Sequence, residues 1–227
     1  MVSIIVPVIN EEVTLKKFIP YITRCISDKN AELIFVDGGS ADETIAICTK
    51  SGAKVFSSPQ KGRASQMNYG ASKAKGSILY FLHVDSLPPP SFVNDILENV
   101  SKGYSAGCYR LTFKPGHYIL SFYAWFTRFN IDFFRFGDQS LFVKKEMFDK
   151  INGFDESLKV MEDQQIVKDL KGVGKFIVMK KKIATSSRKY GEVGVIKLQV
   201  IFTVIVCLFY LGVPQKKIVD FYKKKLN

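Results

Sequence analysis

The chain has 227 residues, of which 47% are hydrophobic and 24% charged, values ordinary for a globular protein with one sizeable core. Its 33 Lys and Arg residues outnumber 21 Asp and Glu residues, and the net charge of +12 favours an anionic partner: nucleic acid, anionic lipid or a phosphorylated substrate. The four cysteines lack C-x-x-C spacing, which argues against a disulfide framework or zinc site and favours reduced thiols in a cytosolic protein.

Apolar runs alternate with helical patterns over residues 1–90. The first run, from Val2 to Val6, lacks the features of a signal peptide and is predicted to be a strand that Pro7 ends. Further strands are predicted at 33–36, 54–57 and 78–82, with helices starting near Asn10, at a capping box over 40–43, and at 61–63. This alternation predicts an α/β fold whose first half is Rossmann-like and parallel. Neither a G-x-G-x-x-G motif nor a P-loop is present, so those modes of dinucleotide and ATP binding are not supported.

The run Ile78-Leu-Tyr-Phe-Leu82 is continuously apolar, which is typical of a strand buried on both faces of a parallel sheet. His83 and Asp85 follow it. Because ligands of open α/β sheets bind outside the carboxyl ends of the strands, both side chains are predicted at that edge. A carboxylate there can hold a divalent cation against a phosphorylated substrate. The alternative is a purely structural pair at a strand end.

The rest of the chain gives shorter patterns. Helices are predicted at 91–100 and 161–170, and strands at 104–113, 140–143, 176–179 and 183–185. The aromatic segment 118–129 is expected to pack as core, to cover a pocket or to touch a membrane. The apolar part of 195–213 is too short to span a bilayer, so a buried or interfacial helix is predicted. A basic amphipathic helix follows from about Pro214.

Three residues of the first half are candidates for nucleotide binding. Asp37 ends the second strand, where a carboxylate can accept hydrogen bonds from a base or ribose; alternatively it only shapes the Gly38-Gly39 turn. Lys61 and Arg63 precede a helix, and basic side chains beside helix N-terminal amides suit a diphosphate. The alternative for both is a solvated loop charge.

Two acidic segments of the second half are candidates for catalysis. Glu162 and Asp163 open a predicted helix, where neighbours point about 100° apart. One carboxylate can therefore face a pocket as general base while the other caps or pairs, although acids at a helix start are often only structural. Asp138 and Gln139 follow the aromatic segment and precede a strand, so they are expected to line a pocket wall.

Motifs in the order and spacing of one family cover nearly the whole chain. They are Val6-Pro-Val-Ile-Asn-Glu-Glu12, Phe35-Val-Asp-Gly-Gly-Ser-Ala-Asp-Glu-Thr44, Lys61-Gly-Arg63, His83-Val-Asp85 and Glu162-Asp163. The set resembles family 2 glycosyltransferases and implies their GT-A fold. A second set resembles a subgroup of small bacterial members described as selenodomain-associated transferases: Gly137-Asp-Gln-Ser-Leu-Phe142, Met161-Glu-Asp163 and Thr185-Ser-Ser-Arg188.

On the donor side, the resemblance implies that Pro7, Glu11 and Asp37 contact the nucleoside. Arg63 would approach the nucleotide phosphates or base, and Lys61 of the same motif is expected to bind the nucleotide sugar beside it. The donor implied is a nucleoside-diphosphate sugar, with a UDP-sugar expected.

On the catalytic side, the resemblance implies that Asp85 holds Mn²⁺ or Mg²⁺ on the diphosphate and also contacts the donor. His83 stands where the family usually has the first acid of Asp-x-Asp, and we expect it to join Asp85 as a metal ligand. Asp163, paired with Glu162 as a second catalytic carboxylate, would be the general base. The expected acceptor pocket comprises Asp138, Gln139 and Arg188.

The implied enzyme is an inverting glycosyltransferase of the hexosyltransferase type. Its GT-A domain is expected over 1–190, with a nucleotide-binding half at 1–90, an acceptor and catalytic half at 91–190, and a helical extension at 191–227. A nucleotide-sugar pyrophosphorylase or other nucleotidyltransferase is an alternative, but its Gly-rich basic loop is replaced by acidic Ile9-Asn-Glu-Glu12. A non-catalytic nucleotide- or membrane-binding module is the third candidate.

The partner of the basic C-terminal region is left open between two kinds of surface. Contact with an anionic membrane would place the protein peripherally on the inner face of the cell membrane and would suit a lipid-linked acceptor. Packing on the core, or on another subunit of a homo-oligomer, would suit a soluble acceptor in the cytoplasm. No nucleic-acid-binding motif is present, so nucleic acid is not expected as a partner.

Overall fold

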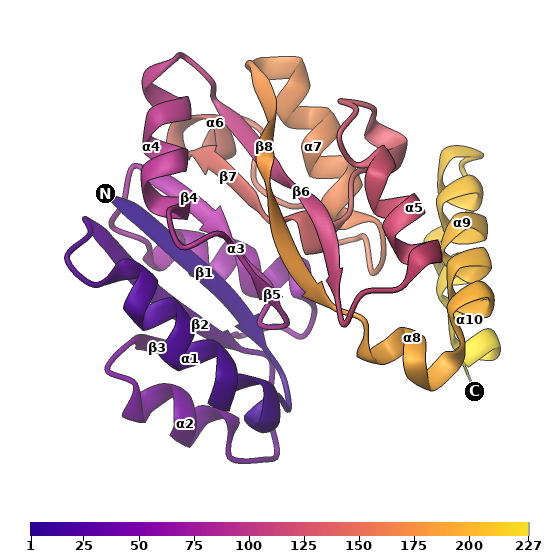
Figure 1. Ribbon diagram of the computed structural model, residues 1–227, viewed down its shortest axis with the longest axis horizontal. Helices are drawn as coiled ribbons and strands as arrows, with labels where there is room; N and C mark the ends of the chain where they lie inside the picture. The colour runs from indigo at the N-terminus through magenta and orange to yellow at the C-terminus, as the bar shows by residue number, and fades with distance from the viewer. Residues whose placement is uncertain (227) are drawn as a thin grey trace.

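Within residues 1–226, which this computed structural model describes, the strands form one eight-stranded mixed sheet in the order β3-β2-β1-β4-β7-β6-β8-β5 (Figure 1). Helices flank the sheet, as the sequence predicted. The N-terminal strands are β1 (Val2–Val8), β2 (Ala31–Asp37), β3 (Lys54–Ser57) and β4 (Ile78–Phe81). They pair only in parallel with one another, which confirms a Rossmann-like first half.

The helices of this half are α1 (Glu12–Ile26), α2 (Thr44–Lys50) and α3 (Arg63–Lys73). Two predicted boundaries were wrong. Pro7 lies inside β1, opposite Val36, because the strand continues to Val8. The capping box at 40–43 does not form, because the Ser40 hydroxyl donates to Asp37 and α2 begins only at Thr44.

The second half extends the sheet through antiparallel pairing of β4 with β7 (Leu141–Lys144). Its other strands are β5 (Ser86–Leu87), β6 (Ala106–Lys114) and β8 (Phe176–Ser186). The two short strands predicted at 176–185 are one strand, which stays paired with β6 through a register shift after Tyr109. Its helices are α4 (Phe92–Ser101), α5 (Tyr118–Phe126), α6 (Lys145–Lys150) and α7 (Glu162–Val173), with 3₁₀ turns η1 (Asp132–Phe134) and η2 (Gly137–Gln139).

Strand β4 is buried on both faces, as its unbroken apolar sequence predicted. Tyr80 points to one face and stacks on Phe92 of α4, with ring centroids 5.2 Å apart. Phe81 points to the other face and meets Phe148 and Phe154 at 5.2 and 5.0 Å. The strand therefore links two hydrophobic cores, and it places the residues that follow it at the centre of the sheet edge.

The C-terminal region forms α8 (Arg188–Val193), α9 (Val195–Tyr210) and α10 (Gln215–Leu226), beside α5 (Figure 1). A small core of Ile201, Ile205 and Ile218 joins α9 to α10, and Val160 and Met161 pack against it. In residues 1–226 no helix has both the length and the apolar character needed to cross a bilayer. The domain boundaries expected at 90 and 190 remain predictions.

Replacing Gly70 with alanine is expected to destabilise the fold. In α3 a Cβ at Gly70 would lie 2.5 Å from Ile5 and 2.9 Å from Val36, and both are fully buried. The clash should outweigh the helical preference for alanine and lower the free energy of unfolding by about 1–3 kcal/mol in urea denaturation. Ser72→Ala, an exposed change in the same helix, should alter it by less than about 0.5 kcal/mol. Equal effects would contradict this prediction.

Candidate active site

The carboxyl ends of β1 and β2 are tied together by the amide of Gln66, which projects from α3. Its Nε2 donates to the carbonyl oxygens of Val8 and Val36 at 3.0 and 2.8 Å. A Cβ at Gly38 would meet this amide at 3.0 Å, so the turn after β2 has little room for a side chain. The strand ends are therefore held in one arrangement. The sequence analysis missed Gln66, because its partners are backbone atoms distant in sequence.

Asp37 is buried at the end of β2, with 2% of its surface exposed. Its carboxylate accepts from the backbone N–H groups of Gly39 and Ser40 at 2.8 and 3.1 Å. Gly39 has φ of +102°, a left-handed conformation that favours glycine. Asp37 thus shapes the Gly38-Gly39 turn, which the sequence had suggested as the alternative to nucleoside binding. Its nucleoside contact remains a prediction.

The loops after β1 and β2 are also joined to each other. The N–H of Glu11 donates to the Thr44 hydroxyl at 2.7 Å, and the N–H of Ala41 donates to the Asn10 side chain at 2.8 Å. Pro7 and Glu11 are half-buried in this region. The donor-side residues from the first two motifs therefore share one edge of the sheet.

Arg63, the first residue of α3, faces the acidic pair that opens α7. Its Nη1 lies 3.6 Å from Oε1 of Glu162 and 3.9 Å from Oδ2 of Asp163. These distances indicate charge attraction rather than short hydrogen bonds. The Glu162 side chain is only 6% exposed and that of Asp163 is 20% exposed, so burial strengthens the interaction. Two motifs about a hundred residues apart thus meet at one site.

We define the acidic cluster as Asp85, Asp138, Glu162 and Asp163, and three of its members, Asp138, Glu162 and Asp163, have raised pKa values. Desolvation and then the Asp85 carboxylate raise the pKa of Asp138 to about 7. Desolvation and then the Glu162 carboxylate raise the pKa of Asp163 to about 7, against the attraction of Arg63. Desolvation also raises the pKa of Glu162. Desolvation opposes the charge of Arg63, but the four carboxylates together raise its pKa.

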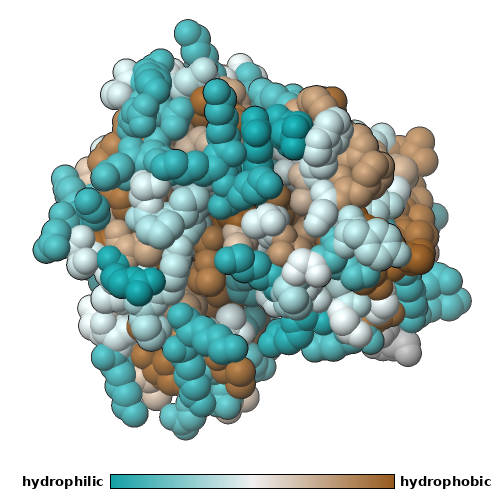
Figure 2. Space-filling model, in the orientation of Figure 1, coloured by the Kyte–Doolittle hydropathy of each residue, from teal (hydrophilic) through white to brown (hydrophobic). Residues whose placement is uncertain are grey.

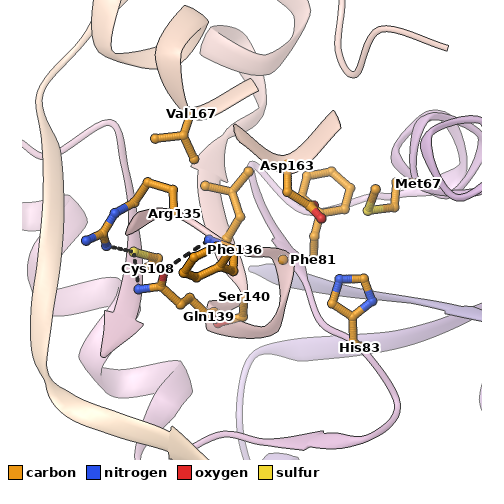
Figure 3. Close-up of a pocket in the computed structure, with 12 residues that line it drawn as sticks. Met67, Phe81, His83, Cys108, Arg135, Phe136, Gln139, Ser140, Asp163 and Val167 are labelled. Carbon is orange, nitrogen blue, oxygen red and sulfur yellow. Dashed lines mark hydrogen bonds between the residues drawn. The ribbon is translucent and has the colours of Figure 1, made fainter. Parts of the chain in front are cut away.

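His83 lies near Asp163 (Figure 3), and Gly137 packs closely against both side chains. A Cβ at Gly137 would be 2.2 Å from Oδ2 of Asp163 and 2.6 Å from Nε2 of His83, so glycine is required there. Desolvation, and then Arg63, lowers the pKa of His83 well below its usual value, which keeps the imidazole neutral. His83 and Asp163 both border a cavity of about 20 Å³, large enough for one water molecule.

Gln139 anchors the loop that carries Gly137 and Asp138. Its Nε2 donates to the carbonyl of Tyr109 at 2.9 Å, and its Oε1 accepts from the N–H of Phe136 at 3.0 Å. Beside it, the buried guanidinium of Arg135 donates to the carbonyl of Thr127 at 2.8 Å and contacts Cys108 (Figure 3). Gln139 therefore fixes this loop and borders the small cavity, whereas Asp138 lines the larger cavity described below.

The acidic cluster has the donor chemistry that a divalent cation requires. Asp85 is exposed, and its carboxylate is close enough to raise the pKa of Asp138. Mg²⁺ in phosphate-binding sites uses one or two carboxylates plus substrate oxygens, so Asp85 with Asp138 fits such an ion. No group of three or more metal-ligating side chains occurs in the part of the chain that the structure describes. His83 as a metal ligand remains a prediction.

A cavity of about 600 Å³, hereafter the large cavity, opens at the acidic cluster and runs between α5 and α9. Five of the predicted site residues line it: Arg63, Asp85, Asp138, Glu162 and Asp163. Arg188 is exposed and pairs with Glu192 at 3.8 Å, away from this lining, and Lys61 is likewise exposed. Three further residues line the large cavity and were not predicted from the sequence, because none of the motifs contains them: Lys159, Gln164 and Lys189.

Comparison with known proteins decides the family. The profile described as Glycosyl transferase family 2 matches residues 3–150. The chain belongs to this family. Membership of this family favours a glycosyltransferase over the other two alternatives that the sequence left open. Membership of the narrower selenodomain-associated subgroup remains a prediction.

Individual relatives agree with this assignment. A glucosyl-3-phosphoglycerate synthase of Mycolicibacterium smegmatis is 32% identical over 105 residues, which cover 42% of this chain and 35% of that enzyme. The match thus spans about a third of the relative's length.

Two solved structures share the fold. One is a mannosyltransferase from Pyrobaculum calidifontis in complex with GDP-Man and Mn²⁺, with a TM-score of 0.71 and 15% identity over 99% of this chain and 69% of that one. The other is glucosyl-3-phosphoglycerate synthase from Mycobacterium tuberculosis in complex with Mn²⁺, UDP and glucosyl-3-phosphoglycerate. Its TM-score is 0.61 and its identity 20% over 94% of this chain and 81% of that one. The GT-A fold is confirmed.

Because the pKa of Asp138 is raised, Asp138→Asn is predicted to increase the stability of the fold in a pH-dependent way. Between its ordinary value of 3.8 and about 7, the folded state binds the proton more tightly than the unfolded state. The wild type therefore loses stability as pH rises through this window. Without divalent cations, the variant should be more stable at pH 8 by on the order of 1 kcal/mol, allowing for partial solvent contact. The gain should shrink towards pH 4.

Urea denaturation in EDTA at pH 4, 6 and 8 measures this effect. Asp220→Asn, an exposed change on α10, should alter the free energy of unfolding by less than about 0.5 kcal/mol throughout. A gain from Asp138→Asn that is constant with pH would contradict the assignment.

Proposed function

We propose that the protein is an inverting glycosyltransferase that moves a sugar from a nucleoside-diphosphate sugar, with UDP-sugar as the expected donor, to an acceptor hydroxyl. The acceptor oxygen attacks the anomeric carbon, its proton passes to Asp163, and the bond from that carbon to the diphosphate breaks. The observation that carries the proposal is the meeting of Arg63, Asp85 and Asp163 at one end of a ligand-sized cavity. Glu162 pairs with Arg63 and supports the base.

Asp163 is suited to the role of general base. Its pKa of about 7 is close to the pH at which a base both exists in the ionised form and accepts a proton readily. Gly137 leaves its carboxylate uncovered by any side chain on that side. Arg63 offsets the charge that accumulates on the leaving diphosphate.

Asp85 and Asp138 would hold Mn²⁺ or Mg²⁺, and such an ion would neutralise charge on the leaving diphosphate. The Mn²⁺ complexes of both fold relatives support this assignment. Pro7, Glu11 and Asp37 would contact the nucleoside and Lys61 its phosphates.

Replacing Asp163 with asparagine should lower transfer roughly 100- to 10,000-fold, because the amide cannot accept the acceptor proton. Binding of the nucleoside diphosphate should stay within about threefold of wild type, since the base contacts the acceptor and not the donor. Turnover assays and calorimetric titration measure the two effects. Asp169→Asn, one and a half turns along α7, should leave both unchanged. An equal loss of binding and turnover would contradict the base assignment.

Replacing Asp85 with asparagine should remove the Mn²⁺-dependent part of donor binding. Wild-type protein is expected to gain more thermal stability from UDP with Mn²⁺ than from UDP in EDTA. The variant should lose on the order of tenfold in affinity with Mn²⁺ and little in EDTA. Asp149→Asn, exposed on α6, is the matched control. Equal losses in both media would contradict the metal role of Asp85. The same measurements with GDP in place of UDP test whether uracil is the preferred nucleobase.

The exposed lysines of α10 support peripheral binding to the inner face of the cell membrane. Neutralising Lys223, Lys224 and Lys225 with glutamine should weaken binding to phosphatidylglycerol vesicles on the order of 100-fold, at about 1 kcal/mol per charge. The control makes the same charge change at the exposed Lys16 and Lys17 of α1 and Lys50 of α2, helices that lie far from α10 (Figure 1). Co-sedimentation at low and high salt measures both. Equal weakening would contradict a specific role for α10.

A further inference from the structure

The large cavity has two chemically different ends. At one end are Arg63 and the acidic cluster. The other end lies between η1 and α9 and is lined by apolar side chains: Phe133, Phe134, Leu198, Phe202, Ile205 and Val206. Its volume of about 600 Å³ lies in the range of pockets that enclose an organic ligand. The apolar walls come from η1 and α9, so this end of the large cavity is distinct from the end at Arg63 and Asp85, which are assigned to the donor.

One buried polar atom in the wall has no partner. Gln164 follows Asp163 on α7 and is 3% exposed. Its Nε2 donates to the carbonyl of Phe133 at 3.3 Å, but its Oε1 is buried without a hydrogen bond. Buried polar atoms are rarely left unpaired, so a side-chain rotation that brings Oε1 to the cavity would gain a hydrogen bond from a ligand donor. A hydroxyl group supplies such a donor.

From these two features we infer that the acceptor is an amphiphile, with a hydroxyl-bearing end at Asp163 and Gln164 and an apolar body between η1 and α9. This inference rests on the proposed function and names the acceptor class. A small hydrophilic acceptor would leave the apolar end to water, which finds few hydrogen-bond partners there. Exposed apolar side chains also lie along α5 and α9, among them Phe122, Trp125 and Val200, and apolar patches are visible between polar residues on the surface (Figure 2).

Acceptors of graded chain length test the inference. Hexyl, octyl and decyl β-glucosides, kept below micelle formation, would be titrated into the full chain by calorimetry without donor. Affinity should rise about threefold to fourfold per methylene while the chain enters the apolar end. With a nucleotide-sugar donor present, KM should fall in the same order. Methyl β-glucoside should be the poorest acceptor.

A matched pair of substitutions on α9 locates the binding site. Val206 lines the large cavity and Val200 on the same helix is 54% exposed outside it. Val206→Phe should weaken decyl glucoside binding at least tenfold, whereas Val200→Phe should bind as wild type. If Val206→Phe does not fold, Thr203→Trp narrows the same cavity from a more exposed position and should give the same loss. Equal affinities in all variants would overturn the site.

Two arms distinguish the source of the amphiphile. Decyl glucoside would be offered as free monomer and embedded in phosphatidylglycerol vesicles. Faster transfer in the vesicle arm supports capture from a bilayer, and faster transfer from monomer supports capture from solution. Affinity and KM independent of chain length in both arms would overturn the inference. Chain-length-dependent binding without turnover of any nucleotide sugar would contradict the proposed function alone.

Discussion

The attraction between Arg63 and carboxylates from separate segments is the interaction on which this site depends. Asp85 follows β4, Asp138 lies in η2, and Glu162 and Asp163 open α7. Grouping so many acids in a partly desolvated space is unfavourable, and the pKa values of Asp138 and Asp163 rise as a result. The guanidinium offsets part of this cost. A cation bound with the phosphates of the proposed donor would offset more of it.

Neutral amide side chains supply the rigidity that the charged groups cannot. Gln66 bonds to the ends of β1 and β2, and Gln139 bonds to β6 and to the loop before η2. Both are buried and donate to backbone carbonyl groups, and Gln139 also contacts Sγ of Cys108. Because they carry no charge, they hold the loops at little electrostatic cost. The reactive groups can then remain close together while their protonation changes.

The two sides of the site differ in construction. The donor side is built from loops between parallel strands of the first half, tied to one another by Glu11, Thr44 and Asn10. The acceptor side is built from α5, η1 and the C-terminal helices, which contribute mainly aromatic and aliphatic side chains. The family profile ends at residue 150, before most of the acceptor wall. The proposed acceptor wall therefore draws on segments both inside and beyond the residues that the profile matches.

The sequence alone determined the strand–helix alternation of the first half, because local periodicity and buried β4 leave few other arrangements. It also singled out Arg63, Asp85, Asp138 and Asp163 as candidate site residues, since polar residues after strands and at helix starts have limited positions in an α/β sheet. Only the tertiary structure decided which of them meet, that His83 lies against Asp163, and that the predicted strands at 176–185 are one. The large cavity likewise forms only where these segments pack together. These outcomes depend on contacts between segments far apart in the chain, and such contacts leave no local pattern to read.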